Sequence, residues 1–148
     1  MKKIVILFIF TLFLTGCGSY EFNFEHEYNE IVLIKIVEFG RETMYITSSD
    51  VEFDEFEYFE IKTIDIKYAE ELYYDIKSIK MHFMPIGEIG VYGKSFLILY
   101  SNGEYDVISA DGMSHFKFDE NGIIRCYISR YYFDETEFIY VMKKYLFM

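Results

Sequence analysis

Three tight-turn signals in the C-terminal half constrain the fold of this chain more than any other feature. They lie between apolar segments at nearly regular spacing and are Asn102-Gly103, Asp111-Gly112 and Asn121-Gly122. Asn-Gly and Asp-Gly accept the positive backbone φ that a tight hairpin turn needs. The sequence therefore predicts an antiparallel meander of four strands, at residues 95–100, 104–109, 114–119 and 123–132.

The upstream part of the chain adds further strands. Phe96 to Tyr100 has no polar break, so we expect this segment at the centre of the sheet, covered on both faces. Residues 31–39 are rich in β-branched types, which favours a buried strand that ends at Gly40. We also expect short strands at 44–47 and 76–84, with a helical turn or a loop at 69–75.

Residues 50–68 alternate between polar and apolar side chains with one slip. Phe59 and Ile61 share one register, whereas Ile64 and Ile66 share the other. A shift of one residue moves side chains to the opposite face of a strand. We therefore expect a β-bulge or a bend near Lys62-Thr63.

An amphipathic helix is predicted at the C-terminus. Asp134 is a suitable N-cap, and Glu137 three residues later completes a capping-box pattern. One apolar stripe at helical spacing follows and comprises Phe138, Val141, Met142 and Tyr145. The predicted fold class is α+β, an antiparallel sheet or meander of six to eight strands with one C-terminal amphipathic helix.

The first residues have the pattern of an export signal. Lys2 and Lys3 precede an apolar run, residues 4–14, that is shorter than the roughly 20 residues of a spanning helix. The run ends in Leu14-Thr15-Gly16-Cys17, which resembles the lipobox of bacterial lipoproteins. Over residues 1–19, this resemblance implies cleavage before Cys17 and a diacylglycerol on its thiol. An uncleaved N-terminal transmembrane anchor is the alternative.

The resemblance also implies a domain organisation and a location. Residues 1–16 would be the lipoprotein signal peptide, 17–29 the lipidated cysteine and a tether, and 30–148 a single globular α+β domain. The protein would lie in the cell envelope, lipid-anchored on the outer side of the cytoplasmic membrane or to the outer membrane of a Gram-negative host. By the family's sorting rule, Gly18 after the cysteine, in place of aspartate, permits transfer to the outer membrane.

The charge of the chain restricts its partners. Loss of Lys2 and Lys3 with the signal leaves 12 basic residues against 25 acidic ones, a net charge of −13. The basic residues are scattered, whereas a nucleic-acid site clusters Lys and Arg. We therefore expect no nucleic-acid partner, and a protein partner of basic character fits the charge better.

Two groups of residues are candidates for contact with that partner. Residues 50–60 concentrate carboxylates, of which the candidates are Asp50, Glu52, Asp54, Glu55 and Glu57. They alternate with Phe and Tyr as on the solvent face of an edge strand. Calcium is the alternative, but the segment has no Asp-x-Asp-x-Asp-Gly loop, so we predict no metal site. Exposed rings are expected at Tyr73, Tyr74, Tyr131 and Tyr132.

Signatures of catalysis are absent from the sequence. It has no Gly-x-Ser-x-Gly elbow, no Ser-x-x-Lys and no phosphate-binding glycine loop. His26, His82 and His115 lack the spacing of a zinc pair, and each is interpreted as a surface or strand histidine. With Cys17 lipidated, only Cys126 remains, so no intramolecular disulfide can form.

These observations predict a function class but no specific ligand. The expectation is a non-catalytic, protein-binding envelope lipoprotein, with an immunity or exclusion protein as one version. It would carry no cofactor apart from the acyl lipid. The alternatives are a structural or assembly lipoprotein of the envelope and a small envelope hydrolase that uses carboxylates.

Overall fold

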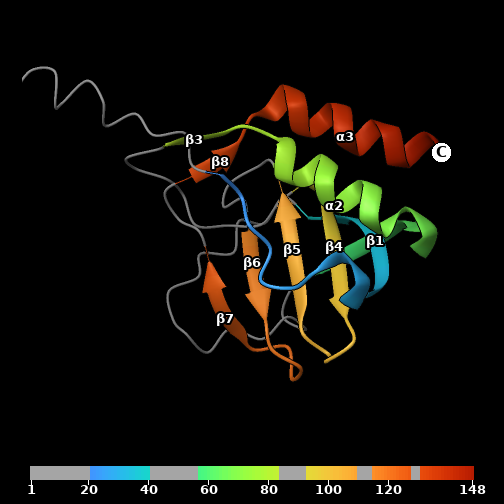
Figure 1. The fold of residues 1–148 in the computed structure, drawn as a ribbon, viewed down its shortest axis with the longest axis vertical. Helices are drawn as coiled ribbons and strands as arrows, with labels where there is room; N and C mark the ends of the chain where they lie inside the picture. The colour runs from blue at the N-terminus through green and yellow to red at the C-terminus, as the bar shows by residue number, and fades with distance from the viewer. Residues whose placement is uncertain (1–20, 41–56, 84–92, 110–114, 128–130) are drawn as a thin grey trace, which may run out of the picture.

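A computed structural model describes residues 21–40, 57–83, 93–109, 115–127 and 131–148 (Figure 1). The main sheet is antiparallel and has the order β2-β1-β4-β5-β6-β7. Its strands are β1 (Ile31–Phe39), β2 (Tyr58–Ile64), β4 (Gly93–Tyr100), β5 (Tyr105–Ser109), β6 (His115–Phe118) and β7 (Ile124–Tyr127). A second, two-stranded sheet pairs β3 (Met81–Phe83) with β8 (Tyr131–Phe133).

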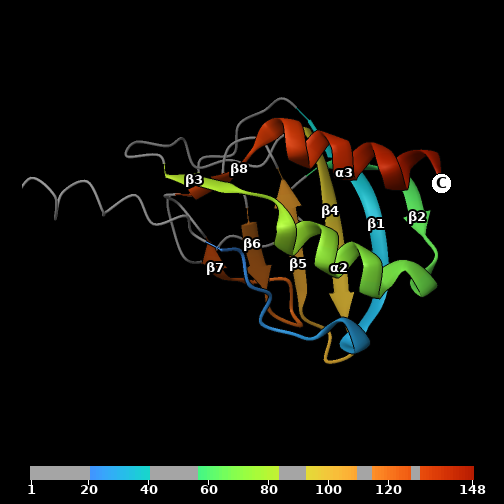
Figure 2. The ribbon, with the colours of Figure 1, turned by 45° about the horizontal axis from the view of Figure 1, so that its top comes forward.

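Two α-helices and two short 3₁₀ helices lie among the described residues, and the fold is α+β as predicted. The helices are η1 (Tyr28–Glu30), η3 (Ile66–Tyr68), α2 (Ala69–Ser78) and α3 (Glu135–Phe147). Both α-helices lie on one face of the main sheet (Figures 1 and 2). Within the described part of the chain, no helix is long and apolar enough to cross a membrane.

The core between the sheet and the helices is built from the predicted stripes. Ile34, Ile36, Phe96 and Ile98 of the sheet are buried against α2 and α3. The apolar stripe of α3 is buried as expected, at Phe138, Val141, Met142 and Tyr145. Burial of such side chains stabilises the fold by roughly 1.5–3 kcal/mol each.

The meander is confirmed in its main features. Gly103 and Gly122 have φ of 89° and 78°, which only glycine adopts readily. The β4 strand lies inside the sheet, as expected. Its helix-facing residues are buried, whereas Leu97 and Leu99 on the other face are half-buried, so the cover on that face is partial.

The predicted slip in the second strand is also present. Ile36 pairs with Lys62 and Val37 pairs with Glu60, so Ile61 is the extra residue of a bulge. The bulge lies one residue before the expected position. It explains why Ile61 is exposed while Ile64 of the same strand is buried in the core.

Two strand predictions are wrong. Residues 76–78 belong to α2, because Ala69, Leu72, Tyr73 and Ile76 follow the i, i+3, i+4, i+7 spacing of a buried helix face. Residues 123–132 do not form one strand, since β7 pairs with β6 and β8 pairs with β3 in the other sheet. The expected strand at 44–47 and the Asp111-Gly112 turn lie outside the described residues.

Residues 21–30, here called the strap, cross the helix-covered face of the sheet over β5 and β6 (Figures 1 and 2). Phe22 is buried, and its ring centroid lies 4.7 Å from that of His115 and 5.1 Å from that of Phe133. Phe24 is also buried and stacks on Tyr73 at 4.5 Å. Both phenylalanines were expected in the tether, so the packed domain includes residues before position 30.

Candidate functional site

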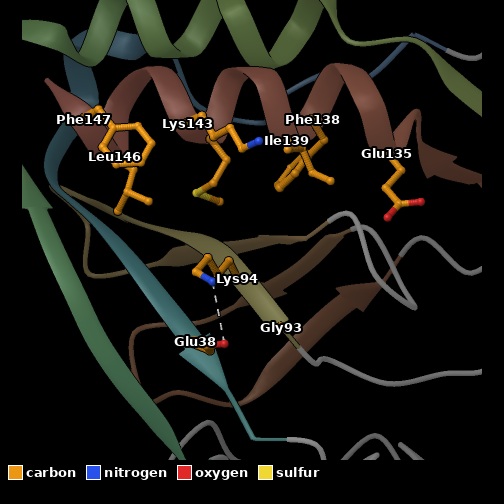
Figure 3. Close-up of a pocket in the computed structure, with 10 residues that line it drawn as sticks. Glu38, Gly93, Lys94, Glu135, Phe138, Ile139, Lys143, Leu146 and Phe147 are labelled. Carbon is orange, nitrogen blue, oxygen red and sulfur yellow. Dashed lines mark ion pairs between the residues drawn. The ribbon is translucent and has the colours of Figure 1, made fainter.

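A groove between α3 and the sheet is the candidate site. Its volume is about 510 Å³. The described residues that line it are Glu38, Gly93, Lys94, Glu135, Phe138, Ile139, Met142, Lys143, Leu146 and Phe147. Figure 3 shows side chains of α3 pointing toward β1 and β4, where Glu38 and Lys94 form an ion pair at 3.8 Å.

The chemistry of this lining is suited to binding. The wall that α3 forms is mainly apolar. The charged groups of the lining are the carboxylates of Glu38 and Glu135 and the ammonium groups of Lys94 and Lys143. The described lining residues include no Ser, Thr, Cys or His that could serve as a nucleophile or a base. An apolar hollow with a few charged groups at its margin is typical of a ligand or peptide site.

Two exposed aromatic side chains stand at the rim of the groove. Phe147, in the last turn of α3, is 80% exposed. Phe59 in β2 is 74% exposed and pairs directly with Glu38. Directly paired residues of an antiparallel ladder project to the same face, so Phe59 lies on the groove side of the sheet. Large exposed rings of this kind are frequent in protein interfaces.

The C-terminal half of α3 is fixed by polar contacts with α2 and β2. The Lys62 ammonium donates to the carbonyl oxygens of Tyr145 at 3.1 Å and Leu146 at 3.2 Å. Lys144 donates to Asp75 at 2.6 Å and pairs with Glu71 at 2.6 Å. The hydrogen bond with Asp75 is the main cause that raises the pKa of Lys144.

The N-terminus of α3 is fixed by its cap. Asp134 accepts from the backbone N–H of Glu137 at 3.0 Å, as predicted. The Glu137 carboxylate, however, accepts from the backbone N–H of Lys80 at 2.8 Å, so the predicted reciprocal half of a capping box is replaced by a contact with the residue just before β3. The groove is therefore built on a helix that is held at both ends.

A second polar cluster, Tyr100–Asp106–His115, is buried beneath the strap. The Tyr100 hydroxyl donates to Asp106 at 2.6 Å, and the other carboxylate oxygen lies 3.1 Å from His115 Nε2. The His115 contact is an ion-pair distance without hydrogen-bond geometry, since neither ring nitrogen has a hydrogen-bond partner among the described residues. Burial, followed by the Asp106 charge, raises the pKa of Tyr100 far above its ordinary value.

This buried cluster has a structural role. Its three residues are at most 3% exposed, so no substrate reaches them in this conformation. His115 is a strand histidine, as interpreted from the sequence, and its ring is covered by Phe22. The cluster therefore lies at the contact between the sheet and the strap.

Ion pairs fasten the strap to the turn ends of the meander. Lys117 donates to Glu25 at 2.9 Å, and His26 contacts Glu104 at 2.7 Å. Arg125 also donates to Glu104. The hydrogen bond from Lys117 lowers the pKa of Glu25, and the hydrogen bond with His26 lowers the pKa of Glu104.

Acid is expected to loosen the strap. Folding lowers the pKa of both carboxylates below the ordinary value of 4.5. Each carboxylate therefore stabilises the folded state fully above pH 4.5. This stabilisation is lost as the pH falls through the lower pKa of the folded state. The hydrogen-exchange protection factors of residues 21–30, which are corrected for the intrinsic exchange rate at each pH, should therefore fall below about pH 4.5. The Glu25→Gln, Glu104→Gln double variant should have lower protection factors at pH 7 and should lose less protection on acidification. An equal acid response in both proteins would contradict the assignment.

The structure separates the contact residues that the sequence suggested. Tyr73 is 3% exposed, so its assignment to an exposed patch is wrong, because helix periodicity places it on the core face of α2. Tyr74 is exposed on α2, whereas Tyr131 and Tyr132 are half-buried on β8. Glu57 is exposed, and the other acidic candidates lie outside the described residues, namely Asp50, Glu52, Asp54 and Glu55.

The groove was not among the sites predicted from the sequence. Its apolar wall includes Ile139, Leu146 and Phe147, which flank the predicted stripe of α3. These three side chains make the apolar surface of the helix wider than the stripe that is buried in the core. This extra width was the sequence pattern that could have indicated a groove.

Neither a metal-binding cluster in the described part of the chain nor a known relative identifies a function. No three His, Cys, Asp or Glu side chains in that part lie close enough together to hold a metal ion. No protein-family model, curated protein or solved structure matches the chain. Function is therefore inferred from the residues of the chain itself.

Proposed function

We propose that this chain is a lipid-anchored lipoprotein of the bacterial cell envelope whose domain binds a partner protein and catalyses no reaction. The groove beneath α3, with Phe147 and Phe59 at its rim, is the observation that carries the binding function. The lipobox-like Leu14-Thr15-Gly16-Cys17 motif supports the anchor.

The chemistry of the groove and the charge of the chain define the partner. Apolar walls and two exposed rings favour an apolar segment of the partner, because buried aromatic side chains supply most of the energy at typical interfaces. The mature chain has 12 basic residues against 25 acidic ones, so a basic partner would be attracted over long range. We therefore propose that the partner inserts an apolar segment flanked by basic residues.

Replacement of the rim aromatic is expected to weaken partner capture. In a pull-down with full-length protein solubilised from membranes, Phe147→Ser should reduce capture about 30-fold, as for loss of an interface hot spot of about 2 kcal/mol. The matched control is Tyr140→Ser, which removes a similarly exposed ring of α3 that does not line the groove. Capture by the control should match the wild type and should weaken at about 0.5 M salt. Equal capture by both variants would contradict the groove as the binding site.

The anchor is tested separately. Cys17→Ala should abolish metabolic labelling with fatty acid and release the protein from the membrane fraction, because one modified thiol carries the acyl chains. Cys126→Ala is the control and should keep both properties, since its thiol lies outside the motif. Continued labelling of Cys17→Ala would refute the assignment.

A further inference from the structure

We propose that the β3–β8 ribbon is the surface through which the domain touches the lipid headgroups of its own membrane. This inference rests on the proposed lipid anchor at Cys17. It adds an orientation, in which one named end of the domain faces the bilayer and the groove rim faces away from it.

The length of chain between the anchor and the strap fixes which end lies near the membrane. Cys17 and Phe22 are five residues apart, and an extended chain spans at most about 3.6 Å per residue, or about 18 Å in total. The Phe22 ring is packed 5.1 Å from the ring of Phe133 in β8. An acylated Cys17 therefore holds β8 close to the headgroup layer.

The composition of the ribbon suits that layer. Its six residues include no Asp or Glu, in a chain that has 25 acidic residues, so the ribbon does not add to the repulsion from a membrane surface. Phe83 is 57% exposed, and Tyr131 and Tyr132 are half-buried. Aromatic rings, those of Tyr in particular, favour the boundary between headgroups and acyl chains.

The carboxylates beside the ribbon have polar partners. Lys80 lies 3.4 Å from Glu137, and His82 Nε2 lies 3.1 Å from Asp134. The Lys80 ammonium reduces the local negative charge that a headgroup would meet. The acidic remainder of the domain opposes contact with anionic lipid, so the surface that fits the ribbon is a zwitterionic one such as phosphatidylcholine.

The same orientation leaves the groove rim accessible. The α3 helix starts directly beyond β8 and has 13 residues, which corresponds to a length of about 20 Å. Phe147 lies at its far end, and β2 with Phe59 lies at the opposite end of the molecule from the ribbon (Figure 2). A partner in the envelope can therefore reach the rim while the ribbon contacts lipid.

A single-tryptophan experiment tests the orientation, because the chain contains no tryptophan. Full-length lipidated Phe83→Trp and Phe59→Trp variants are placed in phosphatidylcholine vesicles that contain a nitroxide-headgroup lipid. Both positions are exposed, and they differ in their distance from the ribbon. We expect the fluorescence of Phe83→Trp to fall about twofold relative to vesicles without nitroxide, with no change for Phe59→Trp.

The possible failures are distinguishable. Absence of quenching in Phe83→Trp, or equal quenching in both variants, would overturn the orientation while mass spectrometry of the same samples confirms the lipid on Cys17. Absence of lipid on Cys17 in that measurement would overturn the anchor and the orientation together. Unchanged far-ultraviolet circular dichroism is required of both variants, so that a difference in quenching reports position and not unfolding.

Discussion

Asp106→Ala is expected to lower the free energy of unfolding by about 1.5–3 kcal/mol, the contribution of a buried hydrogen bond to a charged group. The Asp106 carboxylate accepts from the Tyr100 hydroxyl at 2.6 Å and lies 3.1 Å from His115 Nε2. Alanine would leave that hydroxyl buried without its acceptor and would remove the carboxylate beside the imidazole. A buried polar group that has lost its partner destabilises the fold, because no hydrogen bond offsets the free energy of removing the group from water.

Urea unfolding of the full chain measures this effect, and two further variants separate its causes. Tyr100→Phe removes the donor and leaves the buried carboxylate without the hydrogen bond that the structure shows for it, so its effect should be at least as large as that of Asp106→Ala. Asp106→Asn keeps an acceptor of similar shape and should be less destabilising than Asp106→Ala. A change of less than about 0.5 kcal/mol in Asp106→Ala would show that the cluster does not stabilise the fold in the way described.

Local sequence signals predicted the parts of the fold that depend on neighbouring residues. Gly103 and Gly122 set two turns of the meander because their positive φ is a local requirement. Asp134 caps α3, and the stripe from Phe138 to Tyr145 is buried, since the helical period alone defines that face. The bulge at Ile61 was visible because a slip in alternation is also local.

Long-range pairing was not predictable from the same signals. Residues 76–84 and 123–132 contain apolar runs that fit a strand. In the first run, however, the helical spacing that ends at Ile76 places residues 76–78 in α2. The pairing of β3 with β8 joins segments about 50 residues apart, which no local pattern indicates. Phe22 looked like part of a tether because its partners His115 and Phe133 are more than 90 residues away.

The candidate site was not predictable from the sequence. The acidic composition and the absence of catalytic motifs favoured a binding function, which stays a prediction, whereas the groove arises where α3 meets the ends of β1 and β4. Tyr73 was assigned to a surface because tyrosine is frequent at interfaces, whereas its place on the α2 core face depends on the helix. For Tyr73, the helical spacing of its neighbours therefore predicted burial or exposure better than the residue type did.

Phe22→Ala is expected to destabilise the domain by about 3–5 kcal/mol, because a large buried ring would be replaced by a cavity. The Phe22 ring is 1% exposed and contacts His115 and Phe133. Its loss should also release the strap, so hydrogen exchange of residues 21–30 at pH 7 should rise more than that of β4 and α3. Thermal or urea unfolding together with exchange measures both effects.

The matched control for this variant is Phe59→Ala, which removes the same side chain from a site that is 74% exposed. Surface substitutions of this kind change stability by only about 0.5 kcal/mol. A Phe22→Ala variant as stable as Phe59→Ala would show that the strap contributes little to the core, and the folded domain would then begin near residue 30. A loss several times larger would make the strap part of the domain, and Cys17 would then connect to the packed core through only a few residues.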